Sequence, residues 1–442
     1  MRTKLKILFS LLVVLIIILG FTVPVNLTGG WYQQFMPYLG ASGIKDITFV
    51  DSLIGYAVTN YEGVNDTDYI IKTTNSGNNW YIIRTDAQEF VGFNKVKFIN
   101  TNTGYVTGVT GLEKTINGGT NWIPLNIPVQ ALVYDDISVW NQDTIWLVAN
   151  SNPTGGVFRT NNGGANWIPQ YSAGSANPSH IYMFNSRIGF MDGGGMKKTT
   201  DGGFSWTQVS GEGLFYDMCF SDSLTGWYCA QYIKKTTNGG LSWFNQTLPS
   251  GGNILVTSML KLSMVNKDTL WAVGGQVFYG AGQFRGMIYR TINGGTNWLY
   301  QVPDTTIHIG TYTFINFKGK LNGWAYTTIP TGVHTTTGGD PIWYTGIKKI
   351  NSITPKDFIL YQNYPNPFNP YTTIKLDLNK SNNIKLVICD ILGRELYTIS
   401  YQYLKAGSYS FKWDAKDCSS GIYFYRVTTK DFSETKKMML VK

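Results

Sequence analysis

The chain has 442 residues, enough for two or three domains, and its 14% charged residues, 15% aromatic residues and 49 glycines indicate packed β-structure rather than disorder. The formal net charge of +9 would suit a nucleic-acid partner, but the first residues contribute +3 and residues 351–442 contribute +5. The stretch between them is close to neutral, so we expect no nucleic-acid partner.

The N-terminus has the pattern of a secretory signal peptide. Arg2, Lys4 and Lys6 precede an apolar run from Ile7 to Phe21, which is short for a transmembrane helix. We assign residues 1–25 to the signal peptide and expect no membrane span after its removal. Because no A-x-A cleavage site follows the apolar run, an uncleaved anchor is the alternative.

The middle of the chain consists of repeats about 40 residues long. Each complete repeat carries a turn, here called the box, made of a basic residue, Thr, two residues, Gly or Ser, Gly, two residues and Trp. Six boxes end at Trp80, Trp122, Trp167, Trp206, Trp243 and Trp298. A Gly-aromatic or similar strand with an apolar strand before it occurs seven times. These features predict an all-β fold in which seven four-stranded meanders form a seven-bladed β-propeller over residues 26–350.

The seventh box is incomplete, and two interpretations are open. In the first, Asn26–Trp31 is the end of a box whose outer strand pairs with Gly346–Ile350, so both chain ends close the seventh blade and no sheet edge is exposed. In the second, Thr337–Trp343 is a degenerate seventh box. In either case Asn or Asp caps the turn, glycine takes a positive φ and Trp packs between blades, so the box is structural.

The composition changes after residue 350. A linker over residues 351–359 leads into NYPNPFNP, a rigid extended run that cannot lie in a central strand. Alternating strands and glycine turns follow, and they predict a small Ig-like β-sandwich over residues 360–442.

Both regions resemble known families. The boxes are similar to the Asp-box, or bacterial neuraminidase repeat, and with the Gly-Trp strand they look most like photosystem II assembly-factor-like propellers. The C-terminal region resembles the type A sorting domain of type IX secretion, although Cys389 stands where that family usually has an aromatic residue. The residues that carry this second resemblance are Asn363, Pro365, Asn366, Pro367, Gly393, Arg394, Gly421, Lys437 and Lys442.

The sorting-domain resemblance implies where the protein goes and which partners it meets. It implies export across the outer membrane of a Gram-negative, Bacteroidota-like bacterium by the type IX machinery. A sortase commonly removes such a domain afterwards, which leaves the cargo released or attached to the cell surface.

Because sialidases and some glycosidases share Asp-box propellers, an enzyme must be considered. Sialidases need three arginines around a carboxylate, but Arg159 and Arg290 occupy the basic position of the repeat, filled elsewhere by lysine. Glycosidases of this kind place paired carboxylates between two propellers, and this chain has only one predicted propeller. His180, His308 and His334 lie far apart in the sequence. We therefore predict no catalytic residue, metal or cofactor.

The function favoured by the sequence is a secreted or surface-attached binding propeller for a glycan or protein ligand. A secreted glycosidase and a structural envelope module are the alternatives. The ring of basic residues before the boxes is scaffold or, alternatively, an anion-binding crown. Cys219 and Cys229 are either bonded across a hairpin or free.

The ligand is expected on the face opposite the boxes, where three blades carry long insertions: Tyr61–Tyr69, Gln276–Gly286 and Ile329–Thr345. These insertions are either a site or tolerated surface loops, and the central channel is the next candidate. The predicted ligand residues are Glu62, Asp66, Asp68, Phe278, Tyr279, Phe284, Arg285, His334, Asp340, Trp343 and Tyr344.

Overall fold

The computed structural model of the chain contains β-strands and no helix in its described part. The described residues are 30–60, 67–86, 92–109, 111–127, 133–150, 155–172, 177–250, 254–255, 258–280, 283–303, 307–339, 348–351, 355, 357–404, 406–415 and 418–442. The expected signal peptide lies outside these ranges. Within them, we find no helical stretch with the length and apolar character of a membrane-spanning segment.

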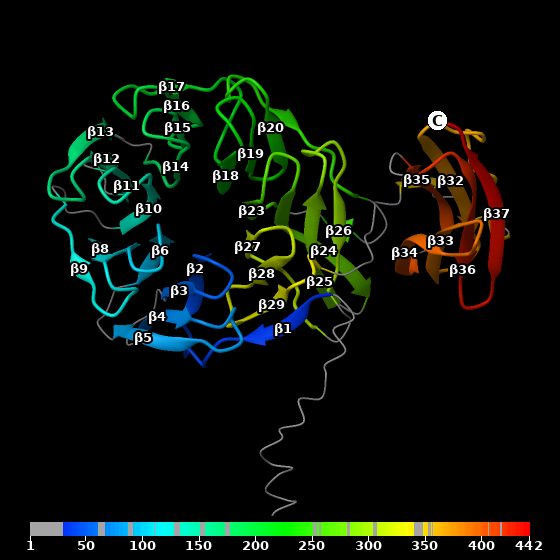
Figure 1. Cartoon of the computed structure of the whole chain (residues 1–442), viewed down its shortest axis with the longest axis horizontal. Helices are drawn as coiled ribbons and strands as arrows, with labels where there is room; N and C mark the ends of the chain where they lie inside the picture. Colours follow the sequence, from blue (N-terminus) through cyan, green and yellow to red (C-terminus); the bar gives the residue numbers. More distant parts are fainter. Residues whose placement is uncertain are drawn as a thin grey trace, which may run out of the picture.

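Seven antiparallel sheets are arranged around a ring, with the first strand of each nearest the centre (Figure 1). Blade 1 consists of β2 (Gly43–Phe49), β3 (Gly55–Asn60), β4 (Asp68–Thr73) and β5 (Tyr81–Asp86). Blade 2 consists of β6 (Phe93–Phe98), β7 (Gly104–Gly108), β8 (Gly111–Thr115) and β9 (Ile123–Pro124), and blade 3 of β10 (Val133–Val139), β11 (Ile145–Asn150), β12 (Gly156–Thr160) and β13 (Ile168–Ser172).

The next three blades repeat this order. Blade 4 consists of β14 (Ile181–Met183), β15 (Gly189–Met191), β16 (Lys197–Thr199) and β17 (Thr207–Gln208), and blade 5 of β18 (Asp217–Phe220), β19 (Gly226–Cys229), β20 (Ile233–Thr236) and β21 (Phe244–Asn245). Blade 6 consists of β23 (Lys261–Met264), β24 (Leu270–Gly280), β25 (Gln283–Thr291) and β26 (Leu299–Gln301), and β22 (Ile254–Leu255) also pairs with β24.

Both ends of the propeller segment build the seventh blade. Its inner strands are β27 (Phe314–Lys318), β28 (Asn322–Tyr326) and β29 (Thr331–Thr335), and its outer strand is the N-terminal β1 (Tyr32–Phe35). The predicted partner of the N-terminal strand was wrong, because β1 pairs with β29 and not with Gly346–Ile350.

The seventh box is divided between the two ends of the propeller segment. The Thr335 hydroxyl accepts the Gly339 N–H at 2.8 Å, as the box threonines of the other blades do, while the buried indole of Trp31 packs edge-on against Trp271 and Phe317. Each of the two interpretations therefore supplied one half. The physical reason is that the threonine must end the strand that leads directly into the box, as Thr335 does in β29, for its hydroxyl to accept the N–H of the box glycine.

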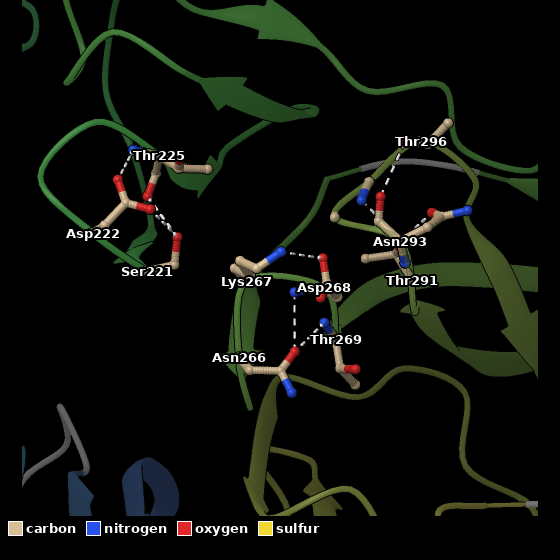
Figure 2. A network of polar contacts seen from close by, with 12 residues as sticks. Ser221, Asp222, Thr225, Asn266, Lys267, Asp268, Thr269, Thr291, Asn293 and Thr296 are labelled. Carbon is tan, nitrogen blue, oxygen red and sulfur yellow. Dashed lines mark hydrogen bonds and ion pairs between the residues drawn. The ribbon is translucent and has the colours of Figure 1, made fainter.

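Hydrogen bonds within each repeat fix the turns on one face of the ring. In blade 6 the Asn266 side chain accepts the N–H groups of Asp268 and Thr269 in the turn between the first two strands (Figure 2). In the box of the same blade, the Asn293 oxygen accepts the Asn297 N–H and the Thr291 hydroxyl accepts the Gly295 N–H. This is turn capping by short polar side chains, so the boxes are a property of the scaffold.

The propeller has no single core. Its described residues form seven separate apolar clusters, one at each junction between neighbouring blades. At the junction of blades 7 and 1, for example, Trp324 stacks on Phe49 at 3.8 Å, and Trp80 lies edge-on to Tyr326. The free thiols of Cys219 and Cys229 belong to the junction of blades 5 and 6.

The C-terminal region has two four-stranded sheets around one apolar cluster, as a sandwich requires. The first sheet has the order β30 (Lys348–Asn351), β35 (Gly407–Asp414), β32 (Tyr371–Leu378) and β31 (Ile359–Leu360). The second has the order β34 (Glu395–Leu404), β33 (Asn382–Asp390), β36 (Gly421–Thr428) and β37 (Ser433–Leu440). The strand expected to close the propeller, β30, therefore pairs here.

Candidate functional site: the central channel

The predicted ligand face is only partly described. Glu62, Asp66, Asp340, Trp343 and Tyr344 lie outside the described residues. Tyr279 belongs to β24, but its side chain is also outside the described part.

The five remaining side chains are distributed over blades 1, 6 and 7. Asp68 is buried and accepts a hydrogen bond from the Thr59 hydroxyl, and buried Arg285 donates to the carbonyl of Ile307. Phe278 and Phe284 face each other near the end of the β24–β25 hairpin, with ring centroids 5.2 Å apart. His334 lies in β29.

Strands make up the described parts of two of the three predicted insertions to a large extent. Residues 276–280 and 283–286 belong to the paired strands β24 and β25, and residues 331–335 are β29. His334 occupies the position that lysine or arginine fills in the other repeats: its ring stacks on Trp324, and it contacts the Tyr32 hydroxyl and the Asn322 amide oxygen. Burial lowers the pKa of His334 to about 4, so it is neutral at pH 7. It is a ring-closing residue.

The basic residues of the repeats are scaffold residues too. Each packs over the aromatic ring of the preceding strand, as Lys72 does over Tyr56 and Arg290 does over Trp271. Lys235 also donates to the carbonyl of Gly294 in the next blade, at 2.7 Å. The same stacking is seen for Lys114, Arg159, Lys198 and Lys235. This arrangement gives no support to an anion-binding crown.

The described residues do line a cavity of about 240 Å³ in the central channel, and it is partly open to solvent. It is bounded by the first strands of blades 2 to 6 and by residues that lead into them. The polar and charged side chains on its wall are Lys95, Lys97, Asp136, Ser138, His180, Tyr182, Tyr216, Asp217 and Lys261.

The charges on the first strands follow a rule. When these strands are aligned on the turn that follows them, one position reads Asp46, Lys95, Asp136, His180, Asp217, Lys261 and Phe314 for blades 1 to 7. Acids therefore stand on the odd blades and bases on the even ones, until the seventh blade breaks the alternation. Sequence reasoning missed this ring because the repeats were aligned on the box and not on the first strand.

The acids of the ring join neighbouring blades. Asp46 accepts the Val96 N–H, Asp136 accepts the Ile181 N–H and Asp217 accepts the Leu262 N–H, each at 3.0 Å. Burial raises the pKa of Asp46, but the positive charges of Lys95, Lys97 and Lys261 outweigh it and hold the pKa below its usual value.

Of the bases, Lys261 is the one most closely held by the acids. Its ammonium lies 3.6 Å from the Asp217 carboxylate. Burial acts to lower the pKa of Lys261, yet the carboxylates of Asp217, Asp46 and Asp136 raise it overall. Lys95 and Lys97 make no ion pair within 4 Å in the described part of the chain.

A histidine is fixed at one end of the cavity. The buried carboxylate of Asp192 accepts the backbone N–H of His180 at 2.9 Å and lies 2.7 Å from its Nδ1. Because an ionised carboxylate only accepts, Nδ1 carries the proton that it binds, and Nε2 is left for the cavity. Close to His180, Asp135 is the unpaired residue of a bulge in β10, and burial raises the pKa of its carboxyl group.

The two ends of the predicted sorting signal come together on the sandwich. Asn366 accepts the Met439 N–H at 2.8 Å, and the Phe368 N–H donates to the Met439 carbonyl. Asn363 is buried and donates to the Thr372 hydroxyl. Pro365, Pro367, Gly393, Arg394, Gly421, Lys437 and Lys442 are exposed.

Comparison with known proteins identifies this second region. Residues 362–442 match the family model of the secretion system C-terminal sorting domain. The chain ends in a sorting domain. This domain marks the protein for type IX secretion to the outside or the surface of the cell. No curated protein matches the chain in sequence.

Solved structures confirm the propeller fold. The chain is similar to YCF48 bound to a D1 peptide, with 20% identity, a TM-score of 0.52 and coverage of 70% of this chain and 97% of that one. It is also similar to the GH74 enzyme of Niastella koreensis, with 13% identity, a TM-score of 0.51 and coverage of 93% and 74%. A third similar structure is PorZ of Porphyromonas gingivalis, a surface component of the type IX system. It has 14% identity, a TM-score of 0.50 and coverage of 92% of this chain and 61% of that one.

Proposed function

We propose that the protein is an exported, non-catalytic binding propeller whose ligand enters the central channel rather than the predicted loop face. The observation that carries this proposal is the state of the charges on the cavity wall. The acids are used to join blades, whereas Lys95 and Lys97 line the cavity without an ion pair within 4 Å among the described residues. His180 is fixed by Asp192 through Nδ1, which leaves its Nε2 atom for a ligand. Fixed polar groups around a cavity are what a binding site requires.

The similar structures are compatible with this role. YCF48 was solved with a bound peptide, so a propeller of this fold can bind a ligand. PorZ is a surface component of the secretion system that the sorting domain addresses. The sortase of that system is the second proposed partner, because it would remove the sorting domain after export.

A secreted glycosidase is the alternative, and one observation favours it. The raised pKa of Asp135 is a property of a general acid. A glycosidase also needs a second carboxylate, free to act as base or nucleophile. The ring acids Asp46, Asp136 and Asp217 instead accept backbone N–H groups that hold the blades together.

The test is to apply the full-length exported protein to glycan and peptide arrays and to assay the same ligands for turnover. We expect binding without hydrolysis. Hydrolysis that is lost in Asp135→Asn, with the fold unchanged, would establish the glycosidase instead. Absence of binding to every glycan and peptide class would favour a structural envelope module.

A further inference from the structure

The charged groups of the channel divide into those the scaffold uses and those it leaves available. Each ring acid has an oxygen bound to an N–H group of the next blade, and Asp217 also attracts Lys261. In blade 2, Lys95 has no such task, and in blade 4 His180 binds Asp192 through Nδ1 and keeps Nε2 available. The ring as a whole is nearly neutral, and Lys95 and Lys97 are cations on the cavity wall that make no ion pair within 4 Å in the described part of the chain.

Lys95 and Lys97 form the centre of this positive charge. They lie two residues apart on β6, so their side chains leave the same side of the strand, and both line the cavity. The positive charges of the two lysines lower the pKa of Asp46, whose carboxylate already accepts the N–H of Val96. Two adjacent ammonium groups held in a channel with no ion-pair partner attract an anionic group strongly.

The rest of the wall suits a polyhydroxylated ring. The carboxylate of Asp136 retains lone pairs beyond those it uses for Ile181, and the Ser138 oxygen, which accepts the Met183 N–H, can still donate its proton. The exposed ring of Tyr216 lies beside His180, with centroids 6.3 Å apart. Acceptors, donors and an apolar ring face together match the hydroxyls and C–H groups of a sugar.

The size of the cavity suits a small group. Its volume of about 240 Å³ is below the roughly 300–1,000 Å³ of pockets that bury drug-sized molecules. A single sugar unit, free or at the end of a chain, is of a size to occupy it.

We propose that the channel cavity binds one acidic sugar unit, with its carboxylate between Lys95 and Lys97 and its hydroxyls toward His180 and Asp136. This inference rests on the proposed binding function and adds the ligand class. A cationic ligand is excluded from the position of the carboxylate, because it would meet the two lysines.

The experiment is calorimetric titration of the full-length exported protein with glucuronate, with glucose, and with a tripeptide ending in a free carboxylate. We expect glucuronate to bind and the other two to bind at least about tenfold more weakly, since each lacks either the charge or the sugar hydroxyls. Lys95→Met/Lys97→Met should weaken glucuronate binding by about tenfold or more. Lys95→Arg/Lys97→Arg should retain most of it.

The matched control is Lys267→Met/Lys320→Met, which removes the same charge from exposed positions outside the cavity wall. It should bind glucuronate as the unchanged protein does. Thermal unfolding of all variants verifies that they are folded.

The outcomes separate the two proposals. Glucuronate binding that survives Lys95→Met/Lys97→Met, or glucose binding as tight as glucuronate binding, would overturn the acidic-sugar inference while leaving the binding function intact. Preference for the tripeptide over glucuronate would overturn it in favour of a peptide terminus. If no probe binds and the arrays are also blank, both proposals fail.

Discussion

The propeller and the sorting domain are both all-β, but they distribute their stability differently. The sorting domain has one apolar cluster, to which strands of both sheets contribute, including Leu376, Phe411, Tyr425 and Met438. The propeller has seven clusters, each shared by two neighbouring blades. A substitution in the core should therefore destabilise the whole sorting domain. In the propeller it should destabilise one junction, unless it opens the ring.

The largest expected effect is on export, from deleting Lys437–Lys442. The deletion removes the buried side chains of Met438 and Leu440 and the N–H group that binds Asn366. We expect the sorting domain to unfold and the protein to remain in the periplasm, with its propeller still resistant to protease. Cell fractionation and limited proteolysis measure both.

The matched control for this deletion is Lys437→Ala/Lys442→Ala, which keeps the apolar residues. Normal export of this variant with loss of export in the deletion would attribute the effect to folding. Loss of export in both, with the control folded, would show that the lysines themselves are recognised. Loss of protease resistance in the propeller would contradict the independence of the two regions.

The next effect concerns the ring-closing junction. Trp31→Ala removes an indole that is 5% exposed, which should cost about 3–5 kcal/mol and also loosen the N-terminal strand. Trp298→Ala, at an interior junction, removes an indole that is 4% exposed. We expect the Trp31 variant to lose more stability in chemical unfolding, because its strand has no covalent link to the rest of its blade. Equal losses would show that the closing junction is no different from the others.

The ring-closing junction should also be sensitive to acid. Burial lowers the pKa of His334 to about 4, so between pH 6.5 and 4 the unfolded chain binds a proton that the folded chain does not. Stability should fall by about 2–3 kcal/mol as the pH is lowered through this window. His334→Gln should flatten the curve, whereas the exposed His308→Gln should leave it unchanged. A persistent slope in His334→Gln would assign it to another group.

The smallest effect is expected in a single box. Asp201 is the one carboxylate at a position that the other five complete boxes fill with Asn. Hydrogen bonds from the hydroxyl and N–H of Ser205 lower the pKa of Asp201 to about 2. Its contribution is present above about pH 4 and is lost as the pH falls toward 2.

In Asp201→Asn we therefore expect the midpoint of acid unfolding to move by less than about half a pH unit. Stability at pH 7 should stay nearly the same, because Asn can accept the same Ser205 N–H. A large loss at pH 7 would show that this box depends on its charge.

The sequence by itself determined the features that repeat. The spacing of the box tryptophans and the Gly-aromatic strands suffice to predict a seven-bladed propeller, because turn chemistry and strand alternation are local. The sorting domain was predicted from the resemblance of NYPNPFNP and the motifs after it to a known family. The role of the box as a capped turn followed from Thr, Asn and glycine within a few residues of one another. The count of strands against boxes also offered the use of both ends of the propeller segment in the seventh blade, as one of two open interpretations.

Only the tertiary structure decided which strand meets β1, and what the channel contains. The segments at residues 331–335 and 346–350 both have strand character, and the choice between them depends on packing against Trp31, hundreds of residues away. Likewise, Asp46, Lys95 and His180 are ordinary charged residues in the sequence, far from any motif. They form one ring only because the inner strands of successive blades are brought side by side around a common axis.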